Sequence, residues 1–246
     1  MLDEEEKPII VNEYNRSFQF DDSDLRLVSA DGVVFKIHTW KLKAASSVFQ
    51  VMFESGNNGD TLELTDKTLE IGRILCMFLQ ILYGIKLAEP SSGWDLKRNH
   101  EELLRLIDKY DAPAAKQHLT TCFRLWAASE KFESDGYFLL ASQLDEYEIA
   151  TTSLKHAMAC RRTWTGPSEG MESRQALLSQ GLKGENTTDG AGWPLNDFRR
   201  LSHEYIFGFM RAKEIVMQPN KPRVDYKLLA AKFEKIMTDL TLEEAN

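Results

Sequence analysis

Alternating polar and apolar positions mark short strands in the first quarter of the chain. Residues 24–28 alternate as a half-buried strand does, and the pair Asp31-Gly32 is typical of a hairpin turn. Residues 33–38 alternate again, which predicts the returning strand. Residues 61–64 predict a third short strand.

Apolar residues spaced three and four apart predict helices between and after these strands. The first helix is expected from Ala45 to Phe53, ending at the segment 56–59, whose Gly and Asn residues tolerate positive φ. The expected buried face of this helix consists of Ala45, Val48, Phe49, Met52 and Phe53. A second helix is expected over residues 71–82, closed by Tyr83-Gly84, and a third up to Tyr110.

Beyond residue 111 the pattern is wholly helical. Helical periodicity covers residues 115–126, 138–144, 147–158, 198–212 and 226–240. We expect the last two to form a helical hairpin that packs against the preceding helices, with Pro219 and Pro222 between them. The segment at about 161–194 is rich in Gly, Thr, Asn, Asp and Ser, which predicts a long exposed loop.

Five short motifs follow one another along these elements. Residues 24–28 resemble a D-x-x-L strand, residues 35–38 an F-x-x-H strand, and residues 42–53 the helix that comes next. Residues 78–84 are similar to L-x-x-L-Y-T-G, and residues 107–111 to A-D-K-Y-D. In combination these motifs resemble the BTB/POZ domain. The residues that carry the resemblance, in structural or interface positions, are Asp24, Leu27, Phe35, His38, Leu42, Phe49, Met52, Phe53, Leu82, Tyr83 and Tyr110.

The resemblance implies an α+β fold, in which a short three-stranded sheet with flanking helices is followed by an all-α C-terminal extension. At 246 residues the chain exceeds the usual size of one domain. We expect a BTB/POZ domain over residues 20–124 and a helical domain over residues 125–243. The second region resembles the extension of many BTB proteins, especially the stand-alone BTB proteins common in fungi.

BTB/POZ domains bind proteins, so the resemblance implies a non-enzymatic interaction module that associates with itself or with other proteins. In the family the hairpin and the first helices often mediate dimerisation, frequently helped by an additional N-terminal helix. Here residues 8–11 and 18–20 look extended, so the sequence leaves dimerisation open.

An alternative role implied by the family is that of a substrate adaptor of a cullin-based ubiquitin ligase. Such adaptors carry a hydrophobic-x-Glu motif in the loop after the Met-Phe helix. In this chain nothing after Gly56 in the segment 52–60 matches that motif, which argues against a cullin scaffold as partner.

Composition narrows the remaining classes. The net charge of −8 opposes nucleic-acid phosphates, and no apolar run approaches the about 20 residues of a bilayer span, so we expect neither nucleic-acid nor membrane partners. The acidic N-terminus lacks the features of a secretory signal, which predicts the cytoplasm or nucleus. The three cysteines, Cys76, Cys122 and Cys160, are expected to be small buried hydrophobic residues.

The sequence predicts no catalytic residues, no cofactor and no metal. The five histidines include no pair at the spacing that places two ligands on one helix face, and the glycine-rich segment lacks a phosphate-binding motif. His38 is expected to bond local backbone groups at the corner between the hairpin and the first helix. A remote alternative is an uncharacterised enzyme whose site lies between the domains near the 161–194 loop.

Overall fold

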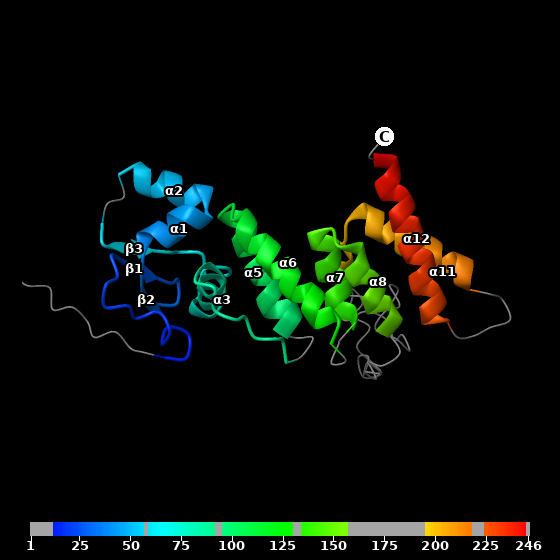
Figure 1. Ribbon diagram of the computed structural model, residues 1–246, viewed down its shortest axis with the longest axis horizontal. Coiled ribbons are helices and arrows are strands. Elements are labelled where there is room, and N and C mark those ends of the chain that lie inside the picture. Colours follow the sequence, from blue (N-terminus) through cyan, green and yellow to red (C-terminus); the bar gives the residue numbers. More distant parts are fainter. Residues whose placement is uncertain are drawn as a thin grey trace, which may run out of the picture. The chain divides into compact units, whose positions relative to one another are not determined.

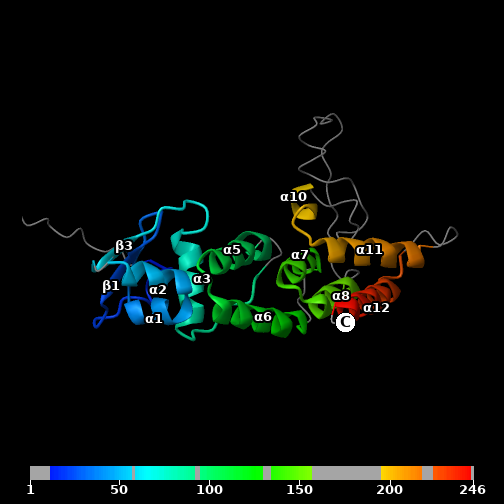
Figure 2. The same cartoon turned by 90° about the horizontal axis from the view of Figure 1, so that it is seen from above.

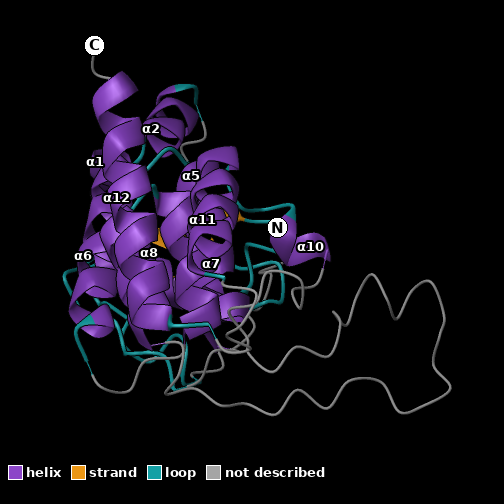
Figure 3. Ribbon diagram, turned by 90° about the vertical axis from the view of Figure 1, so that its right-hand side faces the viewer, coloured by secondary structure: helices purple, strands orange, loops and turns teal. Residues whose placement is uncertain are grey.

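The computed structural model describes residues 12–56, 59–91, 95–129, 134–156, 195–217 and 224–244. These belong to two compact units, one of residues 1–89 with 97–122 and one of residues 90–96 with 123–246. In the described ranges, strands occur only in the first unit, and helices are the predominant secondary structure of the chain (Figure 3). The predicted 161–194 loop, Cys160 and the segment 8–11 lie outside the described residues.

The small sheet has the strand order β2-β1-β3. Strands β1 (Leu25–Val28) and β2 (Val34–Ile37) are antiparallel, whereas β1 and β3 (Thr61–Glu63) are parallel. Gly32 adopts a φ of +83° in the turn, where its lack of a Cβ avoids strain. The predicted hairpin and third strand are confirmed.

Along the chain of the first unit, two helices lie between β2 and β3, and the other helices follow β3 (Figure 1). The bounds of these helices are α1 (Thr39–Ala45), α2 (Ser47–Glu54), α3 (Gly72–Leu82), the π-helical turn η1 (Leu96–His100), α5 (Glu101–Lys109) and α6 (Pro113–Ala127), whose last residues belong to the second unit. Helix α1 packs against α2 and α3, and α3 packs against α5. The α+β fold is confirmed.

The single helix expected from Ala45 is wrong, because two helices meet at Ser46. This residue is extended, with φ −142° and ψ 123°, and its hydroxyl accepts a hydrogen bond from the amide of Phe49 at 3.1 Å. The same hydroxyl donates to the carbonyl of Tyr110, so it caps α2 and ties it to the end of α5. Val48, expected on the buried face, is 37% exposed.

The described part of the second unit consists mainly of helices (Figure 2). Aromatic side chains are prominent in its core. The bounds of these helices are α7 (Ser134–Leu144), α8 (Tyr147–His156), α10 (Leu195–Phe198), α11 (His203–Val216) and α12 (Tyr226–Glu244). The expected helical hairpin forms, since α12 packs against α11 and against α8. The helix expected from residue 198 is divided, because Ser202 starts α11 by accepting a hydrogen bond from the amide of Tyr205 at 3.4 Å.

Aromatic side chains hold α7, α11 and α12 together. The Phe138 ring lies 5.7 Å from that of Phe209 and 5.5 Å from that of Phe233, between ring centroids. Close approach of α11 to α12 depends on Gly208, where an added Cβ would lie 2.8 Å from the sulfur of Met237. The absence of a side chain therefore allows the two helices to pack closely.

Candidate functional site

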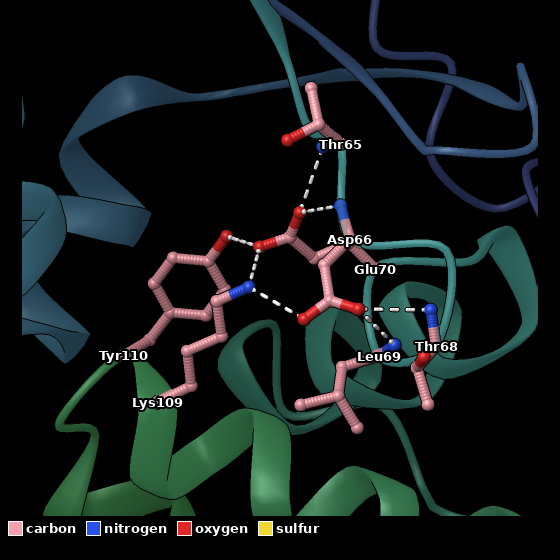
Figure 4. A network of polar contacts seen from close by, with 7 residues as sticks. All are labelled: Thr65, Asp66, Thr68, Leu69, Glu70, Lys109 and Tyr110. Atoms are coloured by element: carbon pink, nitrogen blue, oxygen red, sulfur yellow. Dashed lines mark hydrogen bonds and ion pairs between the residues drawn. The ribbon is translucent and has the colours of Figure 1, made fainter.

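A buried carboxylate joins the segment before α3 to the end of α5 (Figure 4). Glu70 is only 4% exposed, and its Oε2 accepts hydrogen bonds from the amides of Thr65 and Asp66 at 2.9 and 2.8 Å. Its Oε1 accepts one from the Tyr110 hydroxyl at 2.5 Å and pairs with Lys109 Nζ at 2.6 Å. Every oxygen of this buried charge is thus satisfied.

Lys109 also binds a second carboxylate, Asp66, at 2.9 Å. This hydrogen bond, followed by that from the Thr68 amide, lowers the pKa of Asp66 to about 2. Burial alone would raise the pKa of Glu70, but its donors outweigh burial and the pKa is lowered. Burial, and then the bond to Glu70, raises the pKa of Tyr110. The polar groups of this network bond one another, which indicates a structural role in joining the two segments.

A second junction lies at the corner between β2 and α1. Asp24 Oδ1 accepts a hydrogen bond from the amide of Thr39, the first residue of α1, at 2.7 Å. The backbone amide of His38 donates to the Tyr83 hydroxyl at 2.9 Å. The imidazole itself has side-chain partners, with Nδ1 at 3.0 Å from the Tyr83 oxygen and Nε2 at 3.2 Å from Asp22 Oδ1. The expected bonding of the His38 ring to backbone groups is wrong, since both ring nitrogens meet side chains.

The segment before β1 covers this corner with aromatic rings. Phe20 stacks on Tyr83 at 5.1 Å between centroids, and the buried Phe18 meets Tyr83 edge-on at 5.7 Å. Backbone bonds hold the segment to β2, since the Phe18 carbonyl accepts from the Lys36 amide at 2.8 Å and Gln19 pairs with Lys36 in a parallel bridge. Residues before the predicted start at 20 therefore belong to the same core.

Helices α1 and α2 present large apolar side chains to solvent. Trp40 on α1 is 59% exposed, and Val48 and Val51, one turn apart on α2, are 37% and 61% exposed. Nζ of Lys41 lies 4.7 Å from the centroid of the Trp40 ring, which sets a positive charge beside this apolar surface. We call Trp40, Val48 and Val51 the α1–α2 patch. A contiguous exposed apolar surface, rather than a single exposed apolar residue, is typical of a protein-binding site.

The motif residues predicted from the sequence have different locations. Most are buried in the first core, namely Leu27, Phe35, Leu42, Phe49, Phe53 and Tyr110. Asp24, His38 and Tyr83 meet at the corner described above, and Met52 and Leu82 are half-buried. An interface role for these motif residues stays a prediction. None of them belongs to the α1–α2 patch.

Sequence reasoning missed the patch because α1 was not predicted. Trp40 lies between the predicted strand over residues 33–38 and the helix predicted from Ala45, so it was assigned to neither. Val48 fitted the apolar periodicity of the buried face of that single helix. A signal was nevertheless present, since Val51 falls outside the expected buried face.

Neither of the two cysteines in the described ranges has the lowered thiol pKa that is typical of a reactive cysteine. Cys76 is buried, and burial raises the pKa of its thiol to about 11. Cys122 is half-buried, and burial raises its pKa as well. Among the described residues, no group of three or more His, Cys, Asp and Glu side chains could hold a metal ion. None of the described helices has both the length and the apolar character needed to span a bilayer.

Comparison with known proteins gives one family. A search of curated proteins finds no match to the chain. The family model of the BTB/POZ domain matches residues 14–124, a range that includes the sheet, α1, α2, α3, α5 and most of α6. BTB/POZ domains are protein–protein interaction modules, often self-associating and typically without enzymatic activity. Residues 14–124 of this chain are therefore a BTB/POZ domain, followed by a helical C-terminal region.

Proposed function

We propose that this protein is a non-enzymatic interaction module that pairs with a second copy of itself through the α1–α2 patch. The observation that carries the proposal is the exposure of Trp40 and Val51, at 59% and 61%, on a domain of a family that works by binding proteins. Burying two such side chains stabilises a complex, and exposed tryptophan is prominent among the residues that dominate interfaces.

The hydrogen bonds at the junction between β2 and α1 support the same proposal. The amide at the start of α1 is held by Asp24, and Tyr83 holds the residue before it, so Trp40 stands on a fixed helix end. A preorganised surface loses less conformational entropy on binding than a mobile one.

Sedimentation equilibrium of the full chain tests this proposal. We expect Trp40→Glu and Val51→Glu each to raise the dissociation constant of the complex by about tenfold or more, because each places a carboxylate in an apolar contact. The matched control is Leu125→Glu, which changes a 68% exposed leucine on α6. Equal weakening by the control, or no weakening by either patch variant, would contradict the assignment of the patch.

A cullin scaffold is the competing partner. Mixing the chain with a purified cullin N-terminal domain decides between the two roles. Binding at tens of micromolar that the patch variants abolish would replace self-association by an adaptor function. We expect no such binding, because the residues after Gly56 do not match the adaptor motif.

A further inference from the structure

Helix α11 carries two apolar faces. The inner face contains Tyr205, Phe209 and Ala212, which are at most 3% exposed, and it packs against α12. The outer face contains Phe207 and Met210, which are 47% and 53% exposed. The inner face supplies the contribution of α11 to the core of the second unit. The apolar residues of the outer face do not contribute to that core, so they are available for contact with a partner.

The outer face has the spacing of a coiled-coil seam. Its members are His203, Phe207, Met210 and Glu214, all exposed and separated by four, three and four residues. These intervals correspond to successive d, a, d and a positions of a heptad repeat. The buried residues of α11 fall at the remaining b, c and f positions. We call this row of four residues the α11 seam.

The order of residues in the α11 seam favours an antiparallel partner of identical sequence. In an antiparallel pair, a positions of one helix meet d positions of the other. A register that sets Phe207 beside Met210 of the second copy makes two apolar central layers, and the same register sets His203 beside Glu214 in both outer layers. A parallel pair would instead stack Glu214 on Glu214, which is unfavourable.

Charges beside the seam match the same arrangement. Glu204 and Arg211 are exposed and occupy successive e positions, and antiparallel pairing brings e positions of the two helices together. Glu204 of each copy then faces Arg211 of the other. The Arg211 guanidinium lies 5.5 Å from the centroid of the Phe207 ring, so its charge already sits at the edge of the seam.

We propose that α11 pairs antiparallel with α11 of a second copy of this chain through the α11 seam. This interaction is separate from the BTB-mediated association proposed above, because it uses other residues in the other compact unit. The seam spans 12 residues, or about 18 Å of helix, which corresponds to a small and weak interface.

Charge reversal tests the proposed register. The full chain carrying Trp40→Glu and Val51→Glu serves as background, so that only α11 pairing contributes to sedimentation equilibrium at up to several hundred micromolar. We expect Glu204→Arg to raise the dissociation constant by about tenfold, because the introduced guanidinium would face Arg211 of the second copy. The double variant Glu204→Arg/Arg211→Glu should return it to within about threefold of the background value. A double variant as weak as the single one would overturn the antiparallel register.

Substitution of the apolar centre tests the surface itself. Phe207→Glu should leave only monomer, whereas Leu125→Glu, a change at a more exposed leucine outside the seam, should not alter association. Circular dichroism confirms that both variants retain the helical content of the background protein. If Phe207→Glu unfolds, the charge-reversal pair decides alone. A background protein that stays monomeric at several hundred micromolar would refute the proposal.

Discussion

At the scale of single residues, Glu70 and Tyr110 explain why the end of α5 carries a distinctive motif. The tyrosine is 3% exposed, its hydroxyl bonds the buried carboxylate, and its ring stacks on Phe49 at 4.1 Å between centroids. Its carbonyl accepts from Ser46, so one residue fixes both the loop before α3 and the start of α2. Tyr110 thereby links three segments that are distant in sequence.

We expect Tyr110→Phe to lower the free energy of unfolding by about 1.5–3 kcal/mol, because a buried hydrogen bond to a charged group is lost while the ring is kept. Urea denaturation of the full chain measures the loss. The control is Tyr147→Phe, at a half-buried tyrosine, which should cost less than about 0.5 kcal/mol. Equal effects of the two changes would contradict the role given to the Glu70 bond.

The lowered pKa of Asp66 predicts that the free energy of unfolding decreases at acidic pH. Its pKa is lowered from 3.8 to about 2 in the folded state, so the ionised form stabilises the fold at neutral pH. That contribution is present above about pH 4 and is lost as the pH falls through 2. With allowance for the partial exposure of this side chain, we expect a loss of about 1–2 kcal/mol.

Asp66→Asn isolates this contribution, since the amide oxygen can still accept the bonds from the Thr68 and Leu69 amides. Unfolding free energies measured between pH 5 and pH 2 should fall less steeply for the variant than for the parent chain. Parallel curves would mean that other groups, such as Glu70, account for the acid sensitivity.

At the scale of elements, apolar periodicity predicted most helices, but it missed α1 and the positions at which helices divide. Both divisions occur at a serine, Ser46 before α2 and Ser202 before α11, and in each case the serine hydroxyl accepts an amide at the new helix start. Periodicity continues across such a junction, because residues on either side still contact the same core. Serine as an N-cap was the available signal.

The contact between α11 and α12 predicts an unusual response at Gly208. In an unconstrained helix, Gly→Ala gains about 1 kcal/mol. Here an added Cβ would lie 3.2 Å from the Phe233 ring, which is fully buried among aromatic neighbours and cannot move away. We expect Gly208→Ala to lower the melting temperature, and Gly208→Val to lower it further. An increase in melting temperature for the alanine variant would show that the helices can separate at no cost.

At the scale of the whole molecule, local sequence patterns were sufficient to predict the fold but not to predict which residues lie on the binding surface. The strands and most helices follow from short-range alternation and periodicity, and the motif residues Leu27, Phe35 and Phe49 are buried in the core. The Glu70 network, in contrast, joins residues 40 positions apart, and the exposure of Trp40 depends on how α1 packs. Neither can be deduced from neighbouring letters in the sequence.

The two proposed surfaces together predict assemblies larger than dimers. A chain that pairs through the α1–α2 patch and separately through the α11 seam can contact two other copies at once. We expect the weight-average mass of the unmodified chain to exceed that of a dimer at several hundred micromolar, because the seam belongs to the weak class of interfaces. Variants of one surface should stop at the dimer, and a variant of both should remain monomeric. Light scattering over a concentration series distinguishes these cases.

The placement of Glu204 and Arg211 on the α11 seam also makes the proposed pair convertible into an obligate heterodimer. Chains with Glu204→Arg repel one another, and so do chains with Arg211→Glu. A mixture of the two restores opposite charges at both contacts, because the first chain contributes two arginines and the second two glutamates. Two-fold symmetry would thus let a single residue of each chain decide which copies recognise one another.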